Sequence, residues 1–491
     1  MTRASRRAMW TLAVAVAAGA TMITPALAAP GGGDGPSGGI AWRDCTDAEF
    51  TGMRCGTIRV PVDWSRPRGP RVELATVSRP ADDPAHRVGT LMLNNGAGRS
   101  AIEQLRLAMR SGLPNIAGDM AKRFDLVALD PRGVGHSAPV QCSEPLRPEG
   151  VSYFAKDRRA FQRLVSHNRA FARDCVRHNG QVTANVDAVS TARDFEAVRK
   201  ALGERQLNWY GILESTVLGR TYADLFPGRL RTMVLDTALD DTHGTLGRIF
   251  NEAAAAEQAF DRFAAWCTGS PDCALHGRDV GAEYDALVAR ADHDPIPVAD
   301  GSHRPVTGED IRVVTQNYLN ISFIQWPKLA EAIAKARAGD AVGFAVEPDR
   351  TFDRVQAQAQ ACLDMARPAR TFQQVTRVRK RLAAISPHLG GAVSSWTAYA
   401  GCIGSPIRPK PVDAGGRVHG APPALVVQST HQAMALHSEG RALAAQLPGS
   451  VVLSREGDEY SMFLMSKCVR DATNRYLTDR VLPKPGTICT D

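Results

Sequence analysis

The sequence lacks the motifs that identify the common metal and nucleotide enzymes. It contains no C-x-x-C pair, no H-E-x-x-H motif, no Walker phosphate loop and no dinucleotide-binding glycine motif between a strand and a helix. Zinc ribbons, thioredoxin-like redox centres and the usual nucleotide folds would lack their ligands here. We therefore expect neither a metal ion nor a cofactor.

Lysine and long apolar runs are scarce as well. Only nine of the 59 basic residues are lysines, and the 51 acidic residues are spread through the chain, so we interpret the formal charge of +8 as compositional bias and expect no nucleic-acid partner. The densest basic run, Arg377 to Arg381, is typical of a solvated helix face, with an anion-binding patch as the alternative. After the first 30 residues no apolar stretch approaches the ~20 residues of a membrane span.

The first 28 residues have the layout of a secretory signal peptide. Arginines at positions 3, 6 and 7 precede an apolar stretch from Met9 to Ala20, and Ala26-Leu27-Ala28 is a small-x-small cleavage site. Residues 29–40 are rich in glycine and indicate a flexible linker. The sequence therefore predicts a secreted protein without a stable membrane span after cleavage. It does not decide between general and twin-arginine export.

The ten cysteines are even in number, as expected of an exported, disulfide-linked chain. Sequence alone does not fix their connectivity. Pairing of neighbours along the chain is our hypothesis, and it gives Cys45–Cys55, Cys142–Cys175, Cys267–Cys273, Cys362–Cys402 and Cys468–Cys489.

Short apolar strands alternate with amphipathic helices in both terminal parts of the chain, which is typical of a parallel sheet with crossover helices. Strands are predicted at 58–64, 72–77, 90–93, 124–130, 207–210, 233–235, 424–428 and finally 451–453, and helices at 187–203, 215–226 and 439–446. Residues 241–410 have helical stretches, such as 251–266 and 355–366, and few strand signals. We divide the chain into core (41–240), helical cap (241–410) and core (411–491).

Four stretches of this sequence carry a family resemblance. They are Asp130-Pro-Arg-Gly-Val-Gly-His-Ser137, Asn208-Trp-Tyr-Gly211, the run from Leu218 to Pro227, and the tail from Pro423 to Cys489. In these stretches the chain resembles the secreted tripeptidyl-aminopeptidase-like serine hydrolases of actinobacteria. The resemblance implies an α/β-hydrolase fold with a helical cap, and peptide substrates that are bound by a free N-terminus.

The resemblance fails at the nucleophile. The family's elbow has the pattern Y-G-G-S-Y-G-T-x-L-G, whereas residues 210–219 here are YGILESTVLG, so that Leu213 occupies the serine position. An elbow lifts a hydroxyl towards the substrate from a tight turn between a strand and a helix, and leucine has no hydroxyl. Ser215 lies two residues further on, where we expect an ordinary hydroxyl in the first turn of the helix.

The acid and base positions of the family pattern differ too. Gln432 occupies the aspartate position, and Tyr460, 28 residues later, occupies the histidine position. An amide supplies no charge to an imidazolium, and a phenol with a pKa near 10 is a poor base at neutral pH. Loss of the nucleophile or base alone costs about a million-fold in turnover in a well-studied serine protease. We recognise no catalytic residue in this set.

The oxyanion loop of the family is shortened and altered. Here it consists of Asn94-Asn95-Gly96-Ala97-Gly98-Arg99-Ser100, one residue shorter than the family pattern. Its backbone donors can remain while their direction changes. Side chains that could build a different site are His431, His437, Asp236, Asp458 and Glu459, each of which has a surface or loop role as its simpler explanation.

We therefore predict a secreted α/β-hydrolase homologue without Ser-His-Asp catalysis, whose cleft binds a peptide or a small hydrophobic ligand. The candidate binding residues are Asn95, Gly96, Leu213, Glu214, Gln432 and Tyr460. Two alternatives remain open. One is a peptidase that releases N-terminal peptides through an unrecognised nucleophile, and the other is an acid–base enzyme that uses Tyr460 with nearby acids. The oligomeric state and the ligand's identity are not determined.

Overall fold

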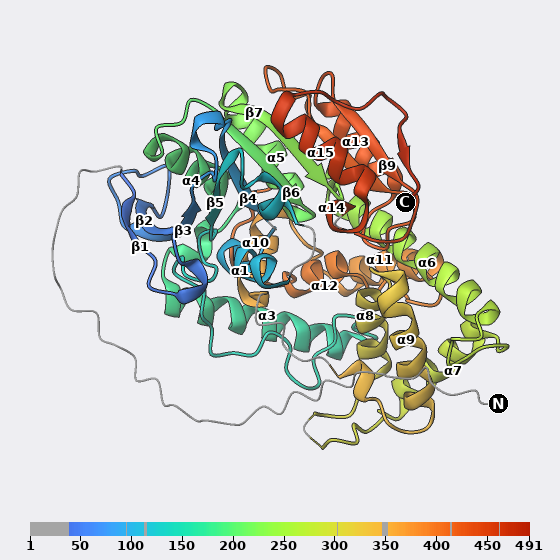
Figure 1. The fold of residues 1–491 in the computed structure, drawn as a ribbon. Coiled ribbons are helices and arrows are strands. Elements are labelled where there is room, and N and C mark those ends of the chain that lie inside the picture. The colour runs from blue at the N-terminus through green and yellow to red at the C-terminus, as the bar shows by residue number, and fades with distance from the viewer. Residues whose placement is uncertain are drawn as a thin grey trace, which may run out of the picture. The chain divides into compact units, whose positions relative to one another are not determined.

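Figure 1 shows the computed structural model of the chain. It describes residues 39–94, 96–111, 115–301, 303–345, 352–412, 415–460 and 462–491. The predicted signal peptide and nearly all of the predicted linker lie outside these residues, so the structure does not test either.

The described residues form one sheet of ten strands, which organises the fold. The strands are β1 (Ala41–Asp44), β2 (Arg54–Pro61), β3 (Arg71–Arg79), β4 (Gly89–Asn94), β5 (Phe124–Leu129), β6 (Leu207–Ile212), β7 (Leu230–Asp236), β8 (Leu425–Ser429), β9 (Val451–Arg455) and β10 (Ile488–Cys489). Their order in space is β1-β2-β3-β5-β4-β6-β7-β8-β9-β10. The pairs from β1 to β5 are antiparallel, and those from β5 through β4 to β10 are parallel.

Along the chain, the helices lie between these strands. They are α1 (Ala101–Ser111), α2 (Ile116–Met120), α3 (Arg158–Asn179), α4 (Ala188–Ala201), α5 (Glu214–Leu225), α6 (Gly244–Gly269), α7 (Val280–His293), α8 (Gly308–Tyr318), α9 (Ser322–Arg337), α10 (Arg354–Asp364), α11 (Phe372–Ile385), α12 (Ser394–Gly401), α13 (His437–Gln446), α14 (Met462–Met465) and α15 (Lys467–Asp479). Helices α6 to α12 all fall between strands β7 and β8.

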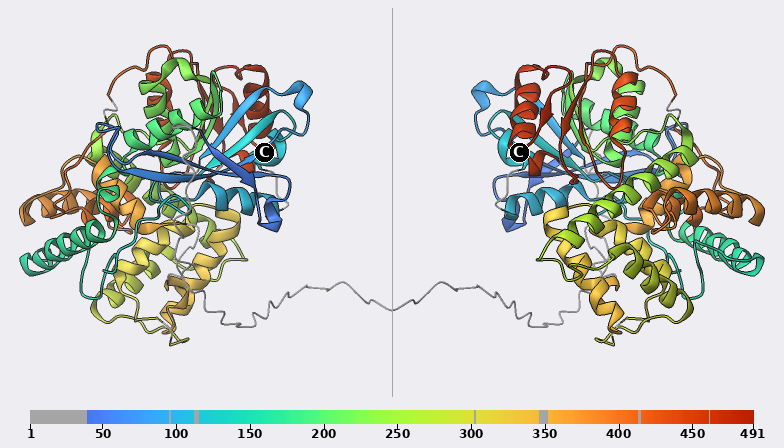
Figure 2. Two further views of the ribbon diagram at one scale, coloured as in Figure 1. Left: turned by 90° about the vertical axis from the view of Figure 1, so that its left-hand side faces the viewer. Right: turned by 90° about the vertical axis from the view of Figure 1, so that its right-hand side faces the viewer.

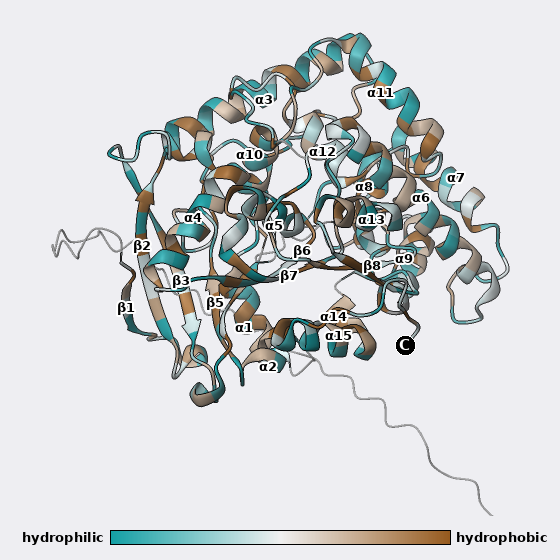
Figure 3. Ribbon diagram, turned by 90° about the horizontal axis from the view of Figure 1, so that it is seen from above, coloured by the Kyte–Doolittle hydropathy of each residue, from teal (hydrophilic) through white to brown (hydrophobic). Residues whose placement is uncertain are grey.

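Both faces of the central strands are buried, each under its own helices (Figure 3). Met92, Trp209 and Met233 pack with α4 and α5, whereas their chain neighbours Tyr210 and Val234 pack with α1, α14 and α15. Adjacent residues of a strand point to opposite faces, so strands that are covered on both sides are apolar throughout. This is why the central strands are short uninterrupted apolar runs in the sequence.

The helices between β7 and β8 have a hydrophobic core of their own. Phe260 and Phe263 of α6, Trp326 of α9 and Trp396 of α12 are buried in it, together with Tyr284 of α7. In Figure 2 these helices form a separate layer beside the sheet. The cap helices, a name that we use for α6 to α12, agree with the helical character predicted for this part of the chain. The predicted limits at 241 and 410 stay predictions.

Several predicted elements shift in the structure, and some are new. Strand β2 ends at Pro61 rather than at 64, because the carboxylate of Asp63 accepts the backbone N–H of Ser65 and turns the chain. The prediction that 451–453 is the last strand is wrong, because β10 pairs in parallel with β9. Strand β1 and the long helix α3 were not predicted. None of the described helices is long and apolar enough to cross a bilayer.

The ten cysteines form the five neighbour pairs of our hypothesis: Cys45–Cys55, Cys142–Cys175, Cys267–Cys273, Cys362–Cys402 and Cys468–Cys489. The last of these links α15 to β10, and so holds the C-terminal strand against the sheet. Such cross-links stabilise mainly by restricting the unfolded chain.

Arg132, in the loop after β5, forms a buried ion pair with Asp194 of α4. Its guanidinium donates to both carboxylate oxygens at 2.6 Å and also to the carbonyls of Pro61, Val62 and Asn185. Both side chains are 1% exposed. The pair therefore joins strand β2, the loop after β5 and helix α4, which explains the D-P-R-G stretch by structure rather than by chemistry.

We predict that Arg132→Met lowers the free energy of unfolding by about 3–5 kcal/mol, because it leaves the carboxylate of Asp194 buried and unpaired. Urea unfolding followed by circular dichroism measures the loss. The matched control is Lys467→Met, which breaks the exposed pair with Asp471 and should change the free energy by no more than about 1 kcal/mol. Equal effects of the two substitutions would contradict the structural role of Arg132.

Candidate functional site

Leu213 lies at the turn between strand β6 and helix α5. Its backbone has φ 54° and ψ −123°, in the left-handed half of the map that leucine rarely enters. Its N–H donates to the carbonyl of Asp236, and its carbonyl accepts the N–H of Thr216. The backbone is therefore an elbow of the kind that carries a nucleophile in this fold, and the side chain on it is that of Leu213.

A small apolar cluster surrounds this turn. Leu213, which is 6% exposed, is buried with Leu239 and Ala435, and Tyr460 packs against them. The other members that pack here are Ile212, Val217 and Met434. Leu213 and Tyr460, the residues predicted at the nucleophile and base positions, thus belong to one apolar cluster. We call it the elbow cluster. The contribution of Leu239, Met434 and Ala435 was missed by sequence reasoning, because no local pattern places them at the turn.

Gln432 lies in the loop after β8 and is 2% exposed. Its side-chain oxygen accepts the backbone N–H groups of Met434 and Ala435 at 2.6 and 2.8 Å. The amide thus folds back on its own loop and helps to place two residues of the elbow cluster. Its Nε2 is buried without a hydrogen-bond partner in the described structure.

The acids beside Tyr460 are already paired. Asp458 accepts two hydrogen bonds from Arg262 of α6 at 2.5 and 2.9 Å. Glu459 pairs with Arg455 and accepts the hydroxyl proton of Ser322 of α9 at 2.6 Å. Both carboxylates are less than 10% exposed. These contacts fasten the loop after β9 to the cap helices and occupy the two groups that could serve Tyr460 as acid or base.

The other polar candidates also have structural partners. Asp236 is fully buried and accepts the N–H groups of Met462 and Phe463 and the hydroxyl of Tyr210, and burial raises its pKa. His431 pairs with Glu456, and the ring of His437 bonds with Ser454. Asp236 is a buried residue of strand β7 and His437 the first residue of helix α13, so the expected surface or loop role does not describe these two. Their partners are nevertheless structural ones, as is that of His431.

Ser215 has the position and burial expected of an ordinary hydroxyl at the start of a helix. It lies in the first turn of α5 and is completely buried. A Cβ added at Gly211 of β6 would lie 2.6 Å from the hydroxyl oxygen of Ser215, so this oxygen points towards strand β6.

The oxyanion loop lies directly against the residue after Leu213. A Cβ at Gly96, whose φ is 98°, would lie 3.0 Å from a carboxylate oxygen of Glu214. The N–H of Gly96 donates to the side chain of Asn94 at 3.1 Å and is therefore already occupied. Candidate residues Gly96 and Glu214 are thus adjacent. Asn95, the remaining candidate in this loop, is outside the described residues.

The cap reaches this loop from the opposite side. Residue Phe352 forms an isolated β-bridge with Arg99, whose guanidinium lies over the phenyl ring at 4.9 Å. The N–H of Asp353 donates to the carbonyl of Gly98 at 2.6 Å. The cap is therefore attached both to the oxyanion loop and, through α6 and α9, to the loop of Tyr460.

Arg248 of α6 places a positive charge beside Glu214, the residue that follows Leu213. Its guanidinium lies 3.3 Å from Asp241 and 4.0 Å from Glu214. Burial disfavours its charged form, but the neighbouring acids outweigh this and raise its pKa. The Glu214 carboxylate is 37% exposed and therefore remains accessible to solvent beside the elbow cluster.

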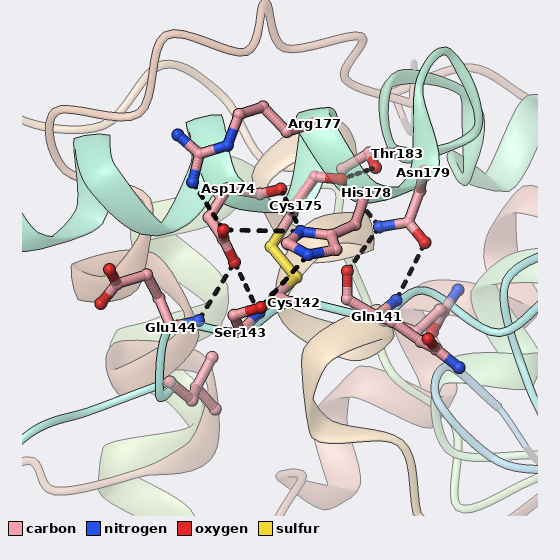
Figure 4. The surroundings of a disulfide bond; sticks show 12 residues. Gln141, Cys142, Ser143, Glu144, Asp174, Cys175, Arg177, His178, Asn179 and Thr183 are labelled. Carbon is pink, nitrogen blue, oxygen red and sulfur yellow. Dashed lines mark hydrogen bonds and ion pairs between the residues drawn. A yellow bond between two sulfur atoms is a disulfide. The ribbon is translucent and has the colours of Figure 1, made fainter.

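A hydroxyl, an imidazole and a carboxylate do meet elsewhere, beside the disulfide Cys142–Cys175 (Figure 4). The Oγ of Ser143 is 3.1 Å from Nε2 of His178, and Nδ1 of His178 is 3.5 Å from Oδ1 of Asp174 but 3.0 Å from its backbone carbonyl. The backbone N–H of Glu144 and that of Ser143 donate to Asp174, which lowers its pKa. Those two donors are therefore unavailable to an oxyanion. His178 is 43% exposed at the end of α3.

Within the described parts of the chain, two groups of side chains have atoms close enough for a metal ion, and each group has a structural explanation. Cys468 and Cys489, which lie beside Asp491, are joined by a disulfide. The second group is Glu257, Asp261 and His388. Glu257 accepts the hydroxyl of Ser386 and the N–H of His388, which makes it an anchor for the loop after α11. The absence of a metal or cofactor stays a prediction.

Comparison with known proteins agrees with the fold. Residues 107–290 match a family model described as alpha/beta hydrolase fold, and 387–489 match one described as TAP-like protein. The chain is 29% identical to a tripeptidyl aminopeptidase of Streptomyces coelicolor, over 89% of this chain and 84% of that one. It is 30% identical to carboxylesterase B of Mycobacterium tuberculosis, over 94% and 92%. The chain belongs to the TAP-like α/β-hydrolase family.

A third relative of this TAP-like hydrolase is the serine protease Hip1 of Mycobacterium tuberculosis, which is 28% identical over 92% of this chain and 91% of its own. The names of these relatives refer to peptidases and an esterase. In the chain described here, the elbow of the fold is retained while its side chain is Leu213.

We predict that Leu213→Gly is more stable than Leu213→Ala by about 1 kcal/mol, because glycine enters the left-handed region without steric cost. Both variants lose the buried isopropyl end of the leucine side chain and differ from each other only in the Cβ methyl, so their difference reports mainly on the backbone conformation. Leu218 of α5 is the matched control, since it is equally buried at 6% but helical, and there glycine should be less stable than alanine by about 1 kcal/mol. Urea unfolding measures all four variants, and the same order at both positions would exclude the elbow conformation.

A second prediction concerns Glu439 of α13, which follows the loop of Gln432. Burial raises its pKa from 4.5 to about 8. The folded protein therefore holds a proton that the unfolded chain has lost, and the free energy of unfolding should fall as the pH rises from about 5 to about 8. Glu439→Gln should flatten this slope in urea unfolding, whereas Glu331→Gln, at an exposed position, should leave it unchanged. A slope unaffected by Glu439→Gln would show that this carboxyl is ionised in the folded protein.

Proposed function

We propose that this TAP-like hydrolase binds a peptide or small apolar ligand at the elbow cluster without cleaving it by Ser-His-Asp chemistry. One observation carries the proposal. Leu213 occupies the elbow in the strained elbow conformation, so the one position from which this fold presents its nucleophile carries a hydrocarbon. The paired acids around Tyr460 and the folded-back amide of Gln432 support it.

The side chains in and beside the elbow cluster suggest the ligand class. An apolar surface with a few polar groups is typical of a binding site. Here the apolar part consists of Leu213, Val217 and Met434, and the polar part consists of the carboxylate of Glu214. A peptide with an apolar end and a free amino group fits both, in keeping with the relatives named for tripeptidyl aminopeptidase activity.

We further propose that the protein works outside the cytoplasm. Five disulfides require an oxidising compartment for their formation. The predicted signal peptide supplies the route.

The second candidate function is hydrolysis at another serine, and Ser143 is the residue that favours it. The order Ser143–His178–Asp174 uses the same ring nitrogens as a catalytic triad. Against it stand the occupied backbone donors and the longer distance to Asp174. Its catalysis would be weak without an oxyanion hole, because that stabilisation is worth about 100- to 1000-fold.

One experiment separates the two candidates. The purified protein is incubated with a fluorescent fluorophosphonate and with aminoacyl and tripeptidyl chromogenic substrates, beside Ser143→Ala, Leu213→Ser and Tyr460→Ala. We expect no labelling and no turnover for the wild type or for Leu213→Ser, since a base and an acid are still missing at the elbow. Labelling that disappears in Ser143→Ala would support the second candidate, and labelling that persists in it would contradict both.

The same variants test ligand binding by thermal unfolding. Apolar tripeptides with a free amino group should stabilise the wild type and Ser143→Ala equally, by about 2.7 kcal/mol at a hundred times the dissociation constant. Tyr460→Ala should abolish the shift. Equal stabilisation of Tyr460→Ala would place the ligand away from the elbow cluster.

A further inference from the structure

The positive charge of this protein is concentrated in two segments, one that contains helix α3 and one that contains helix α11. Residues 156–179 contain seven basic and two acidic residues, and residues 370–385 contain five basic and none acidic. Together they carry a net charge of +10, against +8 for the whole chain, so the rest of the chain is slightly negative. A compositional bias towards arginine would distribute the charge, and therefore does not explain this concentration.

Helix α3 presents its arginines on one side. The six are Arg158, Arg159, Arg163, Arg169, Arg173 and Arg177, all exposed, and we call them the arginine ridge. At 100° per residue they fall within an arc of about 140°. The buried side chains of the helix, including Leu164, Phe171 and Cys175, lie on the other side. The ridge therefore extends over 20 of the 22 residues of the helix, or about 29 Å, with its widest gap between Arg163 and Arg169.

Helix α11 extends this surface. Phe161 of α3 and Phe372 of α11 are in ring contact at 6.1 Å, and Arg379 donates to the carbonyl of Ala155 at 2.5 Å. In Figure 3 the two helices meet along one edge of the molecule's described part. The basic run 377–381 therefore lies on the same side of the protein as the arginine ridge.

A shallow hollow that is largely open to solvent lies where the two helices meet. Lys156, Arg158, Arg159 and Phe372 line it, together with Asp157. Asp157 accepts the N–H of Ala160 and so caps the helix, which leaves three cations facing one acid. Among the described residues, the side chains of Arg158, Arg159, Arg169 and Arg173 make no hydrogen bond or ion pair.

We propose that the arginine ridge, with the hollow at its start, binds a polyanionic chain that carries phosphate groups at short intervals. Guanidinium groups bind phosphate through paired N–H donors, and a row of them along a helix suits a linear ligand. A membrane fits less well. Of the large apolar side chains that are exposed in the described structure, only Val176 lies on α3 and none on α11, so the surface offers no apolar anchor for insertion into lipid.

The test uses long-chain inorganic polyphosphate, labelled with a fluorophore, as the probe. The ridge variant combines Arg158→Gln, Arg159→Gln, Arg169→Gln and Arg173→Gln. The control combines Arg43→Gln, Arg68→Gln, Arg417→Gln and Arg475→Gln, which removes the same charge from exposed positions elsewhere. We expect the ridge variant to lose at least about tenfold in affinity and the control less than twofold.

Salt dependence gives a second measurement. Each phosphate contact contributes about 0.7 to the slope of log affinity against log salt for a single-stranded polyanion, so the ridge variant should have a slope smaller by about 3. Replacing the same four arginines by lysine should restore the salt slope, because the charges return, but only part of the affinity, because lysine lacks the paired donors. Circular dichroism and the thermal midpoint verify that each variant is folded.

Three results would overturn the proposal. The wild type could fail to bind polyphosphate at 100 mM salt, or the ridge and control variants could lose the same affinity. In the third, vesicles of phosphatidylglycerol would bind the wild type more tightly than polyphosphate does, with the same loss in the ridge variant, which would assign the surface to lipid.

Discussion

The turn between strand β6 and helix α5 is the constraint on which the rest of the site depends. A parallel sheet brings the ends of β4, β6, β7, β8 and β9 to one edge, and the turn at residue 213 places one side chain above that edge. The backbone pays for this with a positive φ at a leucine. Thr237, at the end of the neighbouring strand β7, is a second non-glycine residue with a positive φ. Ala138 and Arg480, which lie away from this turn, have a positive φ as well, so two of the four described non-glycine residues with a positive φ lie at the strand ends that build the site.

The charges around the turn are arranged for anchoring. Arg262 and Arg455 bind the two acids beside Tyr460, and Arg248 lies between Asp241 and Glu214. Each pair satisfies groups whose burial would otherwise be costly. The same contacts connect the cap to the loops of the site.

Sequence and structure agree best where a pattern is local. The elbow is flanked by a strand and a helix that both have strong local signals, and so Leu213 could be placed from residues 207–225 alone. The neighbouring cysteines paired as expected because short separations favour closure. Helix α3 escaped prediction because its charged side dominates its composition and its apolar residues are spread thinly over six turns. Strand β10 was not predicted, because two residues carry too little sequence pattern. In the structure a disulfide links this strand to α15.

The sequence by itself determined the fold class, and it predicted the turn at Leu213 together with Gln432 and Tyr460 as the counterparts of a catalytic acid and base. Only the tertiary structure decided how their neighbours are used. Asp458, Glu459, Asp236 and Ser215 were all open candidates until their partners were known, because an ion pair or a buried hydroxyl depends on residues that lie far away in the chain. The arginine ridge has the same origin, since its six side chains form a surface only once the opposite face of α3 is buried against the cap.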